Sequence, residues 1–89
     1  MKHLNIRVIG RVQGVGFRYS ALQAARSFNV RGFIRNEPDG SVYLEAEGEE
    51  QNLEWLLNWC RSSPGHSRVD EVLISDSGLR GFQEFRILP

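Results

Sequence analysis

Residues 4–28 read LNIRVIGRVQGVGFRYSALQAARSF, and the spacing of their apolar residues changes once, at a glycine-rich turn. Apolar residues alternate with other residues from Leu4, which predicts a β-strand that ends near Val12. From Phe17 to Phe28 the apolar residues recur at the spacing of one helix face, which predicts an α-helix. The stretch therefore predicts a strand and a helix joined by a short loop.

The rest of the chain continues this pattern of strands and helices. Its segments are a strand over 30–36, a turn at 37–40, a strand over 42–46, a helix around 53–60 ended by residues 62–65, a strand over 69–74, a turn at 76–78 and a short strand over 82–87. Two helices of this size can cover only one face of a mostly antiparallel sheet. We therefore predict an α+β, ferredoxin-like split βαβ sandwich, β-α-β-β-α-β with a short C-terminal strand. Since 89 residues leave room for one core, residues 1–89 are expected to form a single domain.

The composition excludes several classes of protein. Eleven basic and eleven acidic residues give no net charge, so no broad electrostatic field attracts nucleic acid or an anionic membrane. Arg31-Gly32-Phe33 matches the start of an RNA-binding ribonucleoprotein motif, but the residues after it do not continue that motif. One cysteine cannot form an internal disulfide, and no apolar run suits a signal peptide or a membrane span. We expect a soluble, cytoplasmic monomer that binds neither nucleic acid nor membrane.

The loop between the predicted strand and helix, residues 10–18 (GRVQGVGFR), is the strongest candidate for a binding site. Its glycines allow consecutive backbone N–H groups to point into one concavity at a helix N-terminus, which favours an anion. The loop lacks the Lys-Ser/Thr pair of a nucleotide-triphosphate loop, and Tyr19 stands where a dinucleotide-binding loop has its third glycine. Arg18 adds a planar cation where the helix dipole alone favours an acidic residue. We predict a phosphate site; the alternatives are a plain glycine-rich turn and a solvent-exposed arginine.

Asn36 is the second candidate. It ends the strand over 30–36, next to the Pro38-Asp39-Gly40 turn, where an asparagine often bonds to nearby backbone. In a split βαβ topology this strand end can also lie near the glycine loop, and an amide can hold a water molecule through its donor and its acceptor. Asp39 is interpreted as a turn residue. Both interpretations of Asn36 stay open on the residues alone.

The other chemically capable residues are interpreted as structural. His3 and His66 are expected to be solvated, because neither has a partner at metal-ligand spacing. Cys60 lies on the apolar stripe of the second predicted helix and is expected to be a small core residue. Trp55 and Trp59 share another face of that helix, where packing at the margin of the core is favoured over a surface for a partner. We expect no metal site, no cofactor and no Ser/His/Asp or Cys/His catalytic set.

The two candidate segments carry a resemblance to a known family. Residues 10–18 resemble the first signature of the acylphosphatases, and residues 32–40 (GFIRNEPDG), followed by Val42, resemble the second. The resemblance covers essentially the whole chain, including its size and its order of elements. It departs from the family at Ser63, where a glycine often precedes the proline, and at Cys60, where a larger aliphatic residue is usual. Both departures lie outside the signatures.

The resemblance implies hydrolysis of acyl phosphates to a carboxylate and inorganic phosphate, with no metal and no phosphoenzyme. The residues that it implies are Arg18 and the backbone of Gly14, Val15, Gly16 and Phe17 for binding the phosphate, and Asn36 for orienting the attacking water. Because a carboxylate leaves without a general acid, this chemistry needs mainly positioning and charge stabilisation. Two other functions stay open: a non-catalytic anion-binding or interaction module on the same fold, and a carbamoyl-phosphate-handling domain like the acylphosphatase-like segment of the much longer hydrogenase-maturation proteins.

Overall fold

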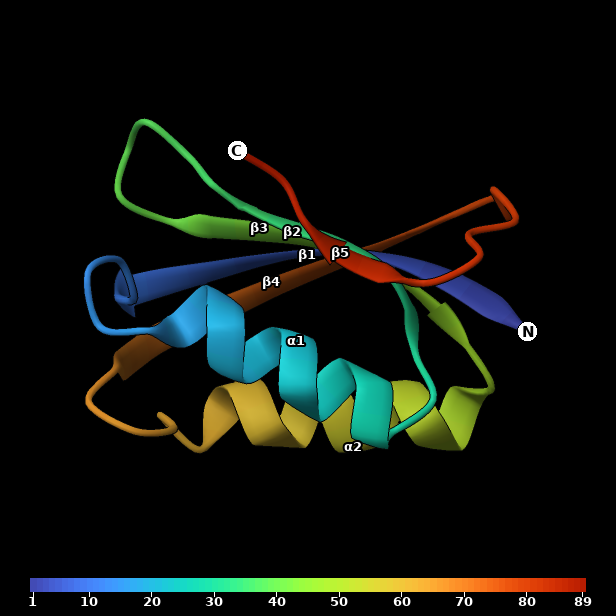
Figure 1. Cartoon of the computed structure of the whole chain (residues 1–89), viewed down its shortest axis with the longest axis horizontal. Coiled ribbons are helices and arrows are strands. Elements are labelled where there is room, and N and C mark those ends of the chain that lie inside the picture. The colour runs from blue at the N-terminus through green and yellow to red at the C-terminus, as the bar shows by residue number, and fades with distance from the viewer.

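The computed structural model describes all residues 1–89. Its elements, in chain order, are β1 (Lys2–Arg11), α1 (Phe17–Ser27), β2 (Arg31–Asn36), β3 (Val42–Gly48), α2 (Glu50–Arg61), β4 (Arg68–Ser77) and β5 (Phe85–Ile87). The strands form one sheet, and both helices cover the same face of it (Figure 1). The predicted ferredoxin-like α+β sandwich with an added C-terminal strand is therefore confirmed. Neither helix combines the length and the apolarity that crossing a membrane requires.

The sheet has the strand order β4-β1-β3-β2-β5. All neighbouring strands are antiparallel except β2 and β5, which pair in parallel. The ladder between β1 and β3 ends at the pair Val8–Val42, whereas β1 continues beside β4 as far as Arg11. The last residues of β1 therefore follow β4 rather than β3 as they enter the loop before α1.

This topology brings two distant segments to one end of the sheet. Because β1 and β2 both run antiparallel to β3, which lies between them, their C-terminal ends lie at the same edge. The glycine loop that follows β1 and the turn that joins β2 to β3 are thus neighbours, at the left of Figure 1. The N-terminus and the segment between β4 and β5 lie at the opposite end.

The core lies between the sheet and the two helices, where each helix buries one stripe. The buried helical residues are Phe17, Ala21, Ala24 and Ala25 on α1 and Leu53, Leu56, Leu57 and Cys60 on α2. The inward side chains of β1 and β3 are buried against them, and those of Ile6 and Leu44 are fully buried. Burial of one such side chain stabilises the fold by about 1.5–3 kcal/mol. The predicted core position of Cys60 is confirmed.

Two predicted boundaries near the C-terminus are wrong. β4 runs on to Ser77, so Asp76 and Ser77 pair with β1 instead of forming the predicted turn at 76–78. β4 is an edge strand that is mostly exposed, so polar residues can continue its ladder and the apolar alternation fades before the strand ends. The last strand begins at Phe85 rather than Phe82; Phe82 lies outside the ladder and packs its ring against Phe33.

Candidate active site

The loop between β1 and α1 has the geometry of an anion-binding nest. Gly14 and Gly16 have positive φ angles of 73° and 76°, whereas Val15 between them does not. Such alternation turns successive N–H groups toward one side of the backbone. A Cβ at either glycine would touch nothing, so the backbone conformation, and not a close contact, requires glycine at both positions. The loop leads directly into α1, since Gly16 is the N-cap residue of that helix.

The N–H groups of the loop and of the first helical turn have no acceptor in the protein. Residues 14–19 donate no backbone hydrogen bond, and Ser20 is the first residue of α1 to do so, to the oxygen of Gly16 at 3.1 Å. A helix N-terminus with free N–H groups carries a partial positive charge, and no acidic side chain in the first turn offsets it. This segment therefore offers an anion several donors and a favourable field.

Arg18 lies in the first turn of α1, next to these donors. Its side chain is partly buried and forms neither an ion pair nor a hydrogen bond with another residue. Arg7 and Arg35, by contrast, both contact the carboxylate of Glu37. The planar guanidinium of Arg18 is thus free to bind an anion through two parallel N–H donors.

Asn36 ends β2, where it pairs with Val42. Its Oδ1 atom is buried and has no hydrogen-bond partner in the protein. The interpretation in which Asn36 caps nearby backbone is therefore wrong for this acceptor. Asp39 caps the turn instead, because its carboxylate accepts hydrogen bonds from the hydroxyl and the N–H of Ser41, which lower the pKa of Asp39. A buried acceptor without a donor costs free energy, which a small polar molecule at Asn36 would recover.

One pocket of about 220 Å³ joins these groups. It is lined by the glycine loop, the first turn of α1, the end of β2 and one residue of β5, namely Val12, Gln13, Gly14, Gly16, Phe17, Arg18, Tyr19, Asn36 and Ile87. The structure thus brings Arg18 and Asn36 to the same cavity, although they lie on different elements. Val15 is the one predicted loop residue outside the lining, and it packs against the hydrophobic core. No lining side chain is a carboxylate, an imidazole or a thiol, the usual metal ligands.

Three further residues of the lining are not among the predicted site residues, although Gln13 lies inside the glycine loop. The Nε2 atom of Gln13 donates hydrogen bonds to the carbonyl oxygens of Glu37 and Ser41, at 2.8 and 2.9 Å. Tyr19 follows Arg18 and is largely exposed, and Ile87 reaches the pocket because β5 pairs with β2. All three positions depend on how distant segments meet, which local periodicity does not report.

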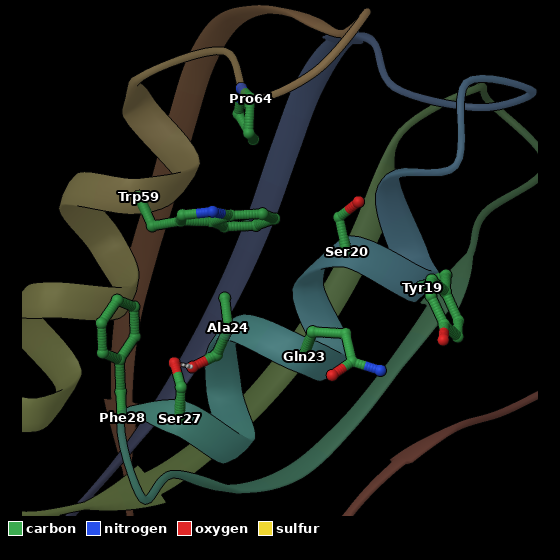
Figure 2. Close-up of a pocket in the computed structure, with 8 residues that line it drawn as sticks. All are labelled: Tyr19, Ser20, Gln23, Ala24, Ser27, Phe28, Trp59 and Pro64. Carbon is green, nitrogen blue, oxygen red and sulfur yellow. Dashed lines mark hydrogen bonds between the residues drawn. The ribbon is translucent and has the colours of Figure 1, made fainter.

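A larger cavity of about 520 Å³ lies between α1 and α2. Figure 2 shows Trp59 reaching from α2 toward α1 across this cavity, between Pro64 and Phe28. No charged side chain lines it, so it offers a phosphate group no cation. Trp59 packs against the ring of Phe17 with centroids 5.4 Å apart, and the more exposed Trp55 packs against Phe28 at 6.0 Å. The favoured interpretation, packing at the margin of the core, is confirmed for Trp59, whereas Trp55 is 47% exposed and contacts Phe28 outside the core.

The solvated position predicted for His3 is wrong, whereas His66 is exposed as predicted. The side chain of His3 is fully buried on the sheet face away from the helices, under the ring of Phe82 at 5.7 Å. Its Nδ1 lies 2.7 Å from Oε2 of Glu47, and its Nε2 lies 2.9 Å from Oε1 of Glu45. This cluster lies at the end of the sheet opposite the glycine loop, so it is separate from the pocket.

The class that this architecture defines is the ferredoxin-like α+β sandwich, here with a glycine loop opening its first helix. Residues 4–87 match the family model of the acylphosphatases. An acylphosphatase of Oceanobacillus iheyensis is 48% identical over 88 residues, which cover 93% of this chain and 97% of that protein. An acylphosphatase of Thermotoga maritima is 42% identical over 87 residues, with coverages of 98% and 97%. The crystal structure of acylphosphatase from Bacillus subtilis superposes with a TM-score of 0.96 at 34% identity, and the match covers 100% of both chains. The chain therefore belongs to the acylphosphatase family and is an enzyme of that family.

Proposed function

We propose that the chain hydrolyses acyl phosphates to a carboxylate and inorganic phosphate in the pocket that joins Arg18 to Asn36. The phosphate oxygens bind to the free N–H groups of Gly14, Val15, Gly16 and Phe17 and to the guanidinium of Arg18. These groups supply positive charge on the side of the loop, where charge on the transferred phosphoryl group has to be stabilised. Membership of the acylphosphatase family supports this substrate class.

Asn36 is proposed to hold the attacking water. Its buried Oδ1 without a partner is the single observation that most favours a bound water, because a water molecule can donate to it and keep a lone pair for the phosphorus atom. The amide is uncharged, so it can hold the water without repelling the phosphate. Asn36 therefore aligns the nucleophile in line with the bond that breaks.

The reaction balances without an acidic side chain in the pocket. The water oxygen forms a bond to phosphorus, and the bond between phosphorus and the acyl oxygen breaks. The leaving carboxylate takes that electron pair, which it holds readily because its conjugate acid has a pKa of about 4. The proton of the water passes to a phosphate oxygen, since no lining side chain offers a carboxylate or an imidazole as base.

The direct test measures phosphate release from acetyl phosphate and benzoyl phosphate in the presence of excess chelator. We expect full activity, because the proposed groups are all backbone amides, a guanidinium and a side-chain amide. Carbamoyl phosphate belongs in the same panel, to test the carbamoyl-phosphate function. Glycerol phosphate is the negative control, because its alkoxide leaving group needs a general acid. Loss of activity on chelation would contradict the metal-free reaction.

Two variants separate binding from turnover. Arg18→Gln removes a charge-assisted contact to the phosphate and is expected to raise KM and the inhibition constant of inorganic phosphate by about 10- to 100-fold. Asn36→Ala leaves the loop intact and is expected to lower kcat by roughly 10²–10³. The exposed residues Arg31 and Asn58, changed to Gln and Ala, are the matched controls. A protein that binds phosphate at the loop but releases none from any acyl phosphate is the non-catalytic anion-binding module instead.

We also propose that residues 1–89 act as one cytoplasmic domain and as a monomer. All the buried apolar residues form one cluster, which supports a single cooperative unit. Size-exclusion chromatography with light scattering measures the oligomeric state, and a dimer mass would contradict the proposal.

A further inference from the structure

Gln13 connects the glycine loop to the turn that follows Asn36. One atom, Nε2, donates to the carbonyl oxygen of Glu37 at 2.8 Å and to that of Ser41 at 2.9 Å. These carbonyls already close the turn, because Ser41 O accepts from the N–H of Glu37 and Glu37 O accepts from the N–H of Gly40. Gln13 therefore holds both ends of the turn from the side of the loop.

No other hydrogen bond joins these two segments. The ladder between β1 and β3 ends at Val8–Val42, and no backbone bond links residues 12–16 to residues 36–41. Asp39 and Arg7 also bind Ser41, but neither belongs to the glycine loop. One side-chain amide thus makes all the hydrogen bonds between the loop and the turn, beyond the point where the strand ladders hold them.

Asn36 depends on this separation. Its Oδ1 makes no bond that would fix the amide, so the backbone at the end of β2 determines where the amide lies. Gln13 holds the residue that directly follows Asn36, and it lines the same pocket. Gln13 is not free to act as a phosphate ligand, because each hydrogen of its amide already points to a carbonyl oxygen. Its remaining polar atom, Oε1, is an acceptor and would repel an anion.

We propose that Gln13 is a positioning residue, which holds Asn36 at the distance from the glycine loop that in-line attack requires. This inference rests on the proposed function, in which the loop holds the phosphate and Asn36 orients the water. Loss of the Gln13 amide releases the turn and misaligns the water, while the N–H groups of the loop and Arg18 still bind phosphate.

The kinetic test compares Gln13→Met, which keeps the length of the side chain and removes the donor, with Gln51→Met on the exposed face of α2. We expect kcat to fall at least about tenfold in Gln13→Met, since a misplacement of about 1 Å can cost on the order of 100-fold. The inhibition constant of inorganic phosphate is expected to stay within about threefold, because the phosphate ligands remain. Gln51→Met keeps the activity of the unchanged chain. Unchanged kcat in Gln13→Met, beside a loss in Asn36→Ala, overturns the inference and leaves the proposed function standing.

A double-mutant cycle distinguishes positioning from general stabilisation. If Gln13 acts by placing Asn36, adding Gln13→Met to Asn36→Ala costs less than about threefold more in kcat. The same factor in both backgrounds would show that Gln13 has a merely structural role.

A measurement that does not need activity keeps the inference testable if the variant fails to fold. In the unchanged protein, NMR should show both Nε2 hydrogens of Gln13 in slow exchange with water, whereas those of Gln51 exchange fast. Fast exchange at Gln13 would contradict the two hydrogen bonds from its side chain to Glu37 and Ser41. If these hydrogens are protected but no acyl phosphate is hydrolysed, the hydrogen bonds from Gln13 to the turn are supported and the proposed function is contradicted.

Discussion

Glu47 accepts more hydrogen bonds than any other carboxylate in the molecule. Its removal therefore tests most directly how much the hydrogen bonds on the sheet face away from the helices stabilise the fold. Its carboxylate is 3% exposed and accepts hydrogen bonds from Nδ1 of His3 and from the N–H groups of Arg80, Gly81 and Phe82. Glu47→Ala removes the acceptor of all four donors, of which the His3 ring is fully buried, whereas the backbone donors at Arg80 and Gly81 lie at exposed positions. Breaking a buried pair in this way costs about 3–5 kcal/mol, a large share of the about 5–15 kcal/mol by which domains are stable. Glu47→Gln keeps one acceptor oxygen and is expected to cost about 1–3 kcal/mol.

The effect of Glu47 should also depend on pH. Burial raises the pKa of Glu47, but the hydrogen bonds from the amide of Arg80, from His3 and from the amides of Phe82 and Gly81 together lower it below its ordinary value of 4.5. A carboxylate with a lowered pKa in the folded state stabilises the fold above its unfolded pKa, and this contribution is lost as the pH falls through the folded pKa. Urea unfolding at neutral pH and at a series of values below about pH 4.5 measures this contribution. The difference between the unchanged chain and Glu47→Gln should shrink toward acid.

The exposed Glu54, changed to Gln, is the control for the loss of one negative charge. Two results would refute the reasoning. One is a Glu47→Ala protein within about 1 kcal/mol of the unchanged chain, as is usual for surface changes. The other is a Glu47→Gln difference that stays constant as the pH falls. Either would mean that the cluster around His3 does not hold the segment between β4 and β5.

Three further predictions concern the core and the sheet. Burial raises the pKa of Cys60 to about 12, so its reaction with a thiol reagent near pH 8 should be on the order of 10³-fold slower than that of a free cysteine. A rate in the folded protein close to that of a free cysteine would contradict the burial of Cys60. Gly32→Ala should cost about 3 kcal/mol or more, because a Cβ there would lie 1.8 Å from the carbonyl oxygen of Glu45; thermal unfolding measures this loss, and an unchanged Tm would refute it. Phe17→Ala should cost about 3–5 kcal/mol in urea unfolding, whereas Tyr19→Ala, at a 63% exposed position, should stay within about 0.5 kcal/mol; equal losses would contradict the difference in burial.

Much of the fold could be predicted because its signals are local. The change from alternating to helical spacing at the glycine loop gives the first strand and helix, and the stripe that ends at Cys60 gives the second helix. Turn residues fix where β2 ends, and so where Asn36 lies in the chain. The edge strand β4 was predicted too short, since its exposed residues carry no apolar pattern.

The contacts that local patterns miss are those between distant residues. His3 looks like an exposed terminal residue in sequence, and its burial depends on Glu45 and Glu47, 42 and 44 positions away. Gln13 likewise bonds to carbonyls 24 and 28 residues further on. Since the carbonyl is present at every residue, nothing in the sequence marks which of them such an amide will reach. The pairing of strands decides both contacts.

The polar groups at the two ends of the sheet differ in whether they have hydrogen-bond partners. This difference distinguishes a structural cluster from a candidate active site. Around Glu47 every oxygen has donors, although the cluster contains more buried charge than the pocket does. At the other end the loop N–H groups have no acceptor, Arg18 has no carboxylate, and Asn36 has a buried oxygen without a donor. Free N–H groups are common to helix N-termini, but a buried polar atom without a partner, such as Oδ1 of Asn36, is rare and often marks a place where a ligand or water binds. Buried charge by itself would have pointed to His3, whereas unsatisfied hydrogen-bonding capacity points to the pocket between Arg18 and Asn36.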